Sequence, residues 1–120
     1  MKNIVFVVTN HKEFKKIAFK SLQEYYGYVN SFDWEAKKEL MRSTQTVPCF
    51  DENLQPVLPK DMGEIVFIAE GAKQCVGFKS LEARDIFACK LLKSEYYIIE
   101  DVDCAESAVE FLQTDEQNES

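Results

Sequence analysis

Three short segments of the chain are apolar without interruption, and they restrict the fold more than any other feature. They cover residues 4–8, 65–69 and 96–99. A strand with one solvated face alternates apolar and polar residues, so continuous apolar runs indicate strands buried on both faces. We therefore expect an α/β or mixed α+β fold: a single-domain sandwich with a central mixed sheet of about four to six strands and about four helices.

Apolar residues at steps of three and four predict the helices that cover this sheet. Asn10 and Glu13 have the spacing of a capping box, and the apolar stripe that follows as far as Val29 predicts a first helix. The same periodicity predicts three further helices, over residues 34–42, 81–93 and 104–112, the last after a capping box at Asp103 and Glu106. We expect their apolar stripes, which include Phe14, Trp34 and Met41, to be buried.

The rest of the chain is expected to form hairpins and a tail. Three prolines between residues 43 and 63 exclude a helix, and apolar segments around a polar turn at 51–53 predict an irregular edge hairpin. Residues 65–69 and 75–78 predict a second hairpin. No internal repeat is apparent. We expect one globular domain over residues 1–112 and a disordered acidic tail over 113–120, which has no apolar residue to bury.

Charge is distributed unevenly along the chain. The net charge is -7, but residues 1–94 contain all 14 basic residues and 12 acidic ones, whereas residues 95–120 contain nine acidic residues and no basic one. A net acidic protein repels nucleic-acid phosphates. The lysine stripe of Lys12, Lys16 and Lys20 is too small a footprint to reverse this. We therefore expect no direct binding of nucleic acid, and an acidic region suited to a basic protein partner.

No motif of catalysis or metal binding is complete. The four cysteines, Cys49, Cys75, Cys89 and Cys104, form no C-x-x-C pair, and His11 is the one histidine. We expect structural thiols, with Cys89 and Cys104 buried as small apolar residues. Residues 100–103 would place carboxylates at a strand end, as a magnesium site requires, but the first strand ends without acidic residues to complete it. We expect neither a metal nor a cofactor.

An anion site is the alternative that the sequence leaves open. Glycines and basic residues precede the third predicted helix, whose exposed amide groups favour anions. They are Gly71, Lys73, Gly77, Lys79, Ser80 and Arg84. They match neither the Walker pattern nor G-x-G-x-x-G. A small α/β enzyme or anionic-ligand-binding domain that uses residues 71–84 and the acidic strand end at 100–103 is therefore the second hypothesis.

Hydropathy predicts a cytoplasmic protein. No unbroken apolar run exceeds five residues, whereas a membrane span needs about 20. The first ten residues lack the long apolar stretch and small-residue cleavage site of a secretory signal. We expect no membrane association.

The favoured hypothesis is a small acidic interaction module without enzymatic activity. Small size, acidity and cytoplasmic location are typical of bacterial toxin-immunity and antitoxin proteins, which inhibit a basic protein such as a toxin nuclease. The expected partner-binding residues are Glu100, Asp101, Asp103, Glu106 and Glu110 as one exposed acidic face, with Phe50 and Leu54 as apolar anchors. A second copy of the chain is the other partner considered, because it could cover one face of the sheet.

Overall fold

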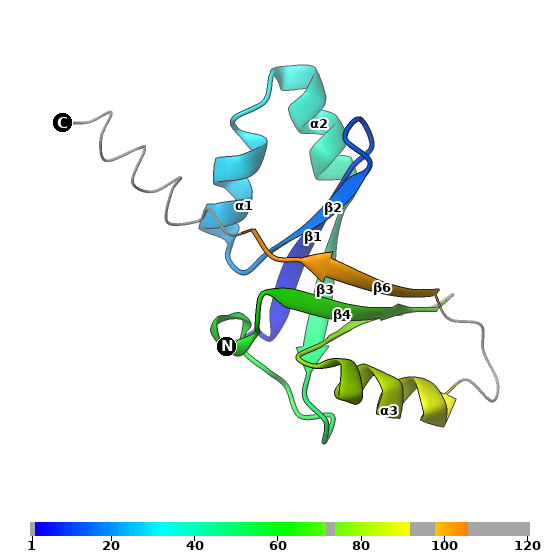
Figure 1. Cartoon of the computed structure of the whole chain (residues 1–120). Helices are drawn as coiled ribbons and strands as arrows, with labels where there is room; N and C mark the ends of the chain where they lie inside the picture. The colour runs from blue at the N-terminus through cyan, green and yellow to red at the C-terminus, as the bar shows by residue number, and fades with distance from the viewer. Residues whose placement is uncertain (1, 72–73, 92–97, 106–120) are drawn as a thin grey trace.

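The computed structural model of the chain describes residues 2–71, 74–91 and 98–105. In chain order the elements are β1 (Ile4–Asn10), β2 (Lys15–Phe19), α1 (Leu22–Val29), α2 (Trp34–Arg42), β3 (Thr44–Phe50), the 3₁₀ turn η1 (Pro59–Asp61), β4 (Ile65–Glu70), β5 (Cys75–Phe78), α3 (Leu81–Leu91) and β6 (Ile98–Asp103) (Figure 1). The fold is mixed α+β, as expected. The described residues contain three α-helices rather than about four.

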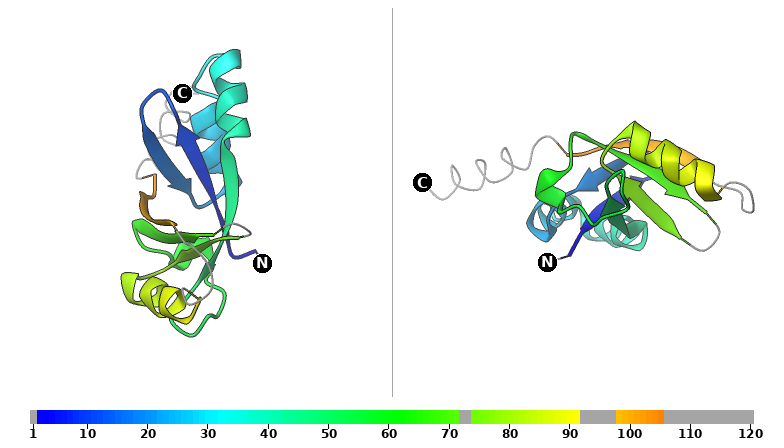
Figure 2. Two further views of the ribbon diagram at one scale, coloured as in Figure 1. Left: turned by 90° about the vertical axis from the view of Figure 1, so that its right-hand side faces the viewer. Right: turned by 90° about the horizontal axis from the view of Figure 1, so that it is seen from below.

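The six strands form one strongly curved sheet in the order β2-β1-β3-β5-β4-β6. Neighbouring strands are antiparallel except β3 and β5, which are parallel. The two edge strands, β2 and β6, meet through a parallel bridge between Ala18 and Cys104. The sheet therefore curls into a barrel-like shape, with α1 and α2 outside one half and α3 outside the other (Figures 1 and 2).

The barrel consists of two halves with the same topology. In each half a central strand pairs antiparallel with the strand after it and with the strand beyond the helix: β1 with β2 and β3, and β4 with β5 and β6. The registers also correspond, because Val5 pairs with Val47 as Val66 pairs with Val102. Two equivalent parallel seams join the halves, one between β3 and β5 and one between β6 and β2.

The repeat is also visible in the sequence once the strands are aligned, so the expectation that the chain contains no internal repeat is wrong. Residues 4–6 and 65–67 are both Ile-Val-Phe, and residues 19–22 and 78–81 are both Phe-Lys-Ser-Leu. The serine of each Phe-Lys-Ser-Leu motif caps the helix that follows it. Ser21 Oγ accepts a hydrogen bond from the backbone amide of Glu24, and Ser80 Oγ accepts one from that of Ala83. Helix α2 has no counterpart among the described residues of the second half.

Three apolar clusters stabilise this arrangement. The inner cluster lies inside the curve of the sheet and takes residues from both halves, among them Val5, Val47, Val66 and Val102. A second cluster lies under α1 and α2 and includes Phe19, Tyr25 and Tyr28, whereas a third lies under α3 and surrounds Phe78. Burial of both sheet faces explains the continuous apolar strand segments.

The first predicted helix is partly wrong, because its first turns form the β1–β2 hairpin. The Asn10 side chain is buried and accepts the backbone amides of Lys12 and Glu13, as it would at a helix start. It also donates to the Tyr28 hydroxyl at 3.0 Å, which holds it in the turn. Asn side chains bond nearby amides in turns as well as in helix caps, so the spacing alone did not distinguish the two.

The hairpin predicted around residues 51–53 is present, but not at the sheet edge. Phe50 forms an isolated antiparallel bridge with Pro56, while β3 itself lies between β1 and β5. Pro48 is tolerated inside the sheet because the parallel ladder of β3 with β5 begins only at Cys49. Proline has no amide hydrogen to donate, and none is needed at residue 48 because no residue of β5 pairs with it there.

Asp103 belongs to a strand, which corrects its assignment as a helix cap. It is the last residue of β6, and Cys104 continues into the bridge with Ala18. The helix expected over 104–112 therefore does not begin at Cys104. Its remaining residues, the tail at 113–120, and the first part of the strand expected at 96–99 lie outside the described residues.

The seam between β3 and β5 yields a test of the packing. A Cβ added at Gly77 would lie 2.8 Å from Val66 Cγ1 and 3.3 Å from Cys49 Sγ. We expect Gly77→Ala to lower the free energy of unfolding by about 1–3 kcal/mol, because the surrounding core must shift. Urea denaturation measures this. At Gly63 a Cβ would meet nothing within 4 Å, so Gly63→Ala is the control. Equal stabilities of the two variants would contradict the packing argument.

Candidate functional site

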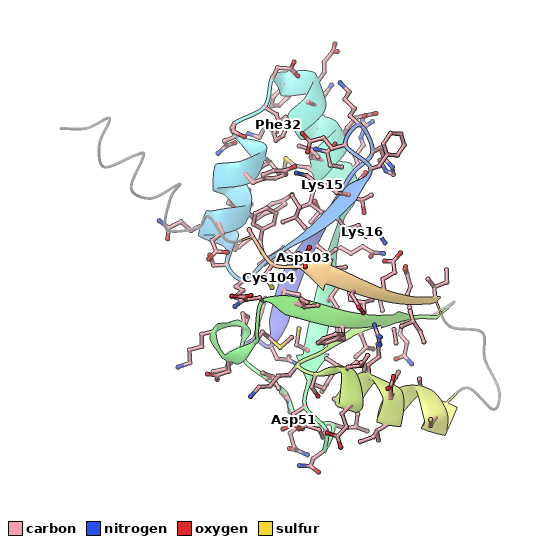
Figure 3. All side chains as sticks on the ribbon, viewed as in Figure 1. Lys15, Lys16, Phe32, Asp51, Asp103 and Cys104 are labelled. Carbon is pink, nitrogen blue, oxygen red and sulfur yellow. The ribbon has the colours of Figure 1, made fainter. Side chains whose placement is uncertain are left out.

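A groove lies beside β6, between this strand and the tip of the β1–β2 hairpin. We call it the β6 groove. Its volume is about 600 Å³. It is lined by Thr9, Asn10, His11, Phe14, Lys15 and Lys16 on the hairpin side and by Glu100, Asp101, Val102 and Asp103 on the β6 side. Figure 3 shows Lys16 and Asp103 approaching this space from the two strands. The groove exists because β2 and β6 meet at the Ala18–Cys104 bridge and diverge beyond it.

Phe14 is the apolar residue at the rim of the β6 groove. Its side chain is 93% exposed, and its backbone φ is 54°, in the left-handed region. Non-glycine residues adopt this conformation at an energetic cost. The turn therefore presents a phenyl ring to solvent instead of burying it, contrary to the expectation that Phe14 belongs to a core stripe.

Three of the five predicted acidic site residues line the groove, but they do not form one unpaired acidic face. Glu100 accepts a hydrogen bond from Lys16 Nζ at 2.6 Å, an ion pair that crosses from β6 to β2. Asp101 points to the opposite face of the strand and pairs with Arg84 Nη1 of α3 at 2.5 Å. Asp103 is exposed and forms no ion pair among the described residues.

Arg84 is buried, and its pairing ties α3 to β6. Its Nη1 also donates to the Glu100 carbonyl at 3.0 Å, and the guanidinium lies over the Phe67 ring at 5.4 Å. The first half has Tyr25 at the equivalent place, where its ring stacks on Phe6. The two halves thus share a packing position over an equivalent phenylalanine. Tyr25 occupies it in the first half and Arg84 in the second.

The other predicted site residues lie elsewhere or outside the described residues. Phe50 packs against the cluster under α3, so it has a core role that the sequence analysis did not assign. Leu54 is 42% exposed, at a positive φ of 59° in the turn after β3. Figure 3 shows the neighbouring Asp51 far from Asp103, beside the start of α3. Glu106 and Glu110 lie outside the described residues.

Helix α2 carries a second exposed aromatic residue, Trp34, which is 67% exposed. Lys37 and Lys38 place their ammonium groups 5.9 and 5.8 Å from the indole centroid. Met41, about two helical turns after Trp34, is also exposed. The apolar spacing of residues 34–41 predicted a helix correctly, but it assigned Trp34 and Met41 to the core.

The environments of the cysteines disfavour thiolate chemistry at three of them. Burial raises the pKa of Cys49 to about 12 and that of Cys75 to about 11, and it also raises the pKa of Cys104. Thiols with raised pKa values remain protonated and are weak nucleophiles at neutral pH. Cys89, which was expected to be buried, is exposed on α3. Among the described residues no group of three His, Cys, Asp or Glu side chains is placed to hold a metal ion.

Comparison of the chain with protein-family models, curated proteins and solved structures finds no match. Within the described residues, no helix is both long enough and apolar enough to span a membrane.

The thiol environments predict a simple labelling pattern. At pH 8 in the folded protein we expect Cys89 to react quickly with a disulfide reagent such as DTNB. Cys49, Cys75 and Cys104 should react slowly, because their raised pKa values and burial leave little accessible thiolate. Mass spectrometry of alkylated peptides assigns the sites, and denaturation in urea should expose all four. Fast labelling of folded Cys49 or Cys104 would be inconsistent with the buried positions.

Proposed function

We propose that this protein is a binding module that recognises another protein through the β6 groove and the exposed hairpin tip. The observation that carries the proposal is the position of Phe14, a fully presented phenyl ring at the rim of a groove with exposed carboxylates on its other side. Aromatic side chains surrounded by polar groups are frequent anchors in protein interfaces.

We further propose that the partner is basic and that the module inhibits it in the cytoplasm, as immunity proteins and antitoxins do. The net charge of -7 supports a basic partner, since opposite charges accelerate encounter and disfavour other partners. Asp103 places part of this charge at the groove, where it forms no ion pair with another described residue. A toxin nuclease is one such partner, because a nuclease presents positive charge to its substrate.

The alternative, an enzyme or anionic-ligand domain that uses residues 71–84, has less support. Arg84 would be its deepest cation, but its guanidinium is already held by Asp101 and by the Glu100 carbonyl. Ser80 is likewise engaged, because its hydroxyl caps α3 and donates to Glu52. An anion would have to displace these partners.

If negative charge at the β6 groove attracts a basic partner, reversal of that charge should slow the association of the two proteins. After the partner has been identified by co-purification from the native cell, we expect Asp103→Lys to slow association several-fold at low salt, with a smaller effect at high salt. Asp61→Lys is the matched control, since it makes the same charge change at an exposed position of η1 that does not line the groove. Surface plasmon resonance measures both. Equal association rates for the two variants would refute a role for the groove in steering. Asp101 is avoided because its substitution would leave buried Arg84 uncompensated.

If Phe14 anchors the partner, its removal should change the dissociation rate of the complex. Phe14→Ala should speed dissociation and weaken binding by about 1–2 kcal/mol, the range of an interface anchor. The fold should be unaffected or slightly stabilised, because the removed ring is exposed. Trp34→Ala provides the comparison, since it removes a different exposed aromatic residue. If Trp34→Ala weakens binding and Phe14→Ala does not, the partner binds at α2 instead of the β6 groove.

A further inference from the structure

Within the part of the chain that the structure describes, the outer edge of β6 has backbone groups with no strand paired to them along most of its length. Cys104 donates its amide to the Glu64 carbonyl, so the even-numbered residues of β6 direct their backbone groups towards β4. Ala105 donates in the opposite direction, to the Ala18 carbonyl. Because strand residues alternate, Asp103, Asp101 and Ile99 direct their amide and carbonyl groups outward, towards the side of β2.

Strand β2 does not cover this edge along its length. Among the described residues, the pairing of β2 with β6 consists of the single bridge between Ala18 and Cys104. The equivalent seam between β3 and β5 has two paired positions. Further along β6, contact with β2 is made by the side chains of Lys16 and Glu100. The backbone edge at Asp101 and Asp103 therefore borders the β6 groove, and Ile99 continues this edge just beyond it.

The exposed side chains of this edge also suit pairing. Ile98 and Ile99 are 48% and 46% exposed at the start of β6. Open strand edges with β-branched apolar residues are templates for pairing with another chain. An extended segment could thus continue the sheet beyond β6, with Phe14 across the groove.

The strand that pairs with β6 could come from a second copy of this chain or from a basic partner. Charge distinguishes these two possibilities. Antiparallel pairing of β6 with β6 of a second copy would bring Glu100, Asp101 and Asp103 of both copies into one ladder. Like charges opposite one another destabilise a pair of strands, whereas opposite charges stabilise it. Glu100 and Asp101 are paired with Lys16 and Arg84, so the uncompensated charge of this edge is that of Asp103, which forms no ion pair among the described residues. This charge disfavours self-pairing and favours a strand with lysine or arginine close to Asp103.

We propose that β6 binds its partner by strand addition, and that the added strand is an extended basic segment that alternates cationic and β-branched residues. The inference rests on the proposed function and specifies how the groove would recognise a basic partner. Main-chain hydrogen bonds to Ile99, Asp101 and Asp103 would provide affinity, and the carboxylates would select the side chains.

A synthetic peptide tests this without the natural partner. The probe is a fluorescein-labelled peptide of sequence Lys-Val-Lys-Thr-Lys-Val-Lys-Thr, and binding to the full chain is measured by fluorescence anisotropy at low salt. Two control peptides carry backbone N-methyl groups, one on every lysine and the other on every Val and Thr. Each control blocks one edge of the extended peptide and keeps its charge. We expect one control to bind about tenfold or more weakly and the other to bind nearly as well as the probe.

A change in the protein provides the second arm. Ile99→Pro removes an outward amide at an edge position where proline is tolerated, and Ile99→Val keeps it. We expect Ile99→Pro to weaken probe binding about tenfold, and Ile99→Val to leave it nearly unchanged. Thermal unfolding monitored by circular dichroism shows whether each variant is folded.

The outcomes separate this inference from the proposed function. Equal binding of both methylated peptides would show attraction by charge alone and would overturn strand addition. Absence of probe binding by the wild-type chain would overturn it as well. Neither result would affect the salt-dependent association with the natural partner, which tests the proposed function independently.

Discussion

The structure depends on two equivalent close contacts between its halves. At one seam Cys49 of β3 pairs with Gly77 of β5, and at the other Cys104 meets Ala18 of β2. Each cysteine thus faces a residue with little or no side chain, which lets the backbones approach. A three-stranded half has an apolar inner face that it cannot cover alone. The inner cluster, which takes residues from both halves, is therefore completed only when these seams form.

Differences between the halves identify the positions at which the chain departs from its own repeat. Core positions are matched, as Phe6 and Phe67 or Phe19 and Phe78 illustrate. The differences lie in the hairpin tip with Phe14, in helix α2 with Trp34, and in the pair of Arg84 with Asp101. The pair of Arg84 with Asp101 ties α3 to β6. Phe14 and Trp34 are exposed and do not contribute to the core, so their presence needs another explanation, and binding of a partner is a consistent one.

The sequence predicted correctly those strands and helices whose pattern lies within a single segment of the chain. Continuous apolar segments located β1 and β4, and the periodicity of apolar residues located α2 and α3. It was not sufficient where one pattern serves two structures, as with Asn10, whose side chain bonds the same amides in a hairpin as in a helix cap. Alignment of the two Phe-Lys-Ser-Leu motifs would have resolved this, since it matches residues 16–19 with the strand at 75–78. Of the site, the sequence located the acidic residues of β6 but not Phe14 or the partners Lys16 and Arg84, because these contacts join segments far apart in the chain.

The charge on β6 also bears on pairing between identical chains. An uncovered edge with two exposed isoleucines would favour pairing between identical chains. The unpaired carboxylate of Asp103 opposes this, because pairing of two copies would bring like charges close together, whereas Glu100 and Asp101 are paired within the chain. The repulsion is specific to acidic edges and becomes attraction for a basic strand. A single feature, negative charge on an incompletely covered strand, thus disfavours self-association and favours the class of partner proposed for this module.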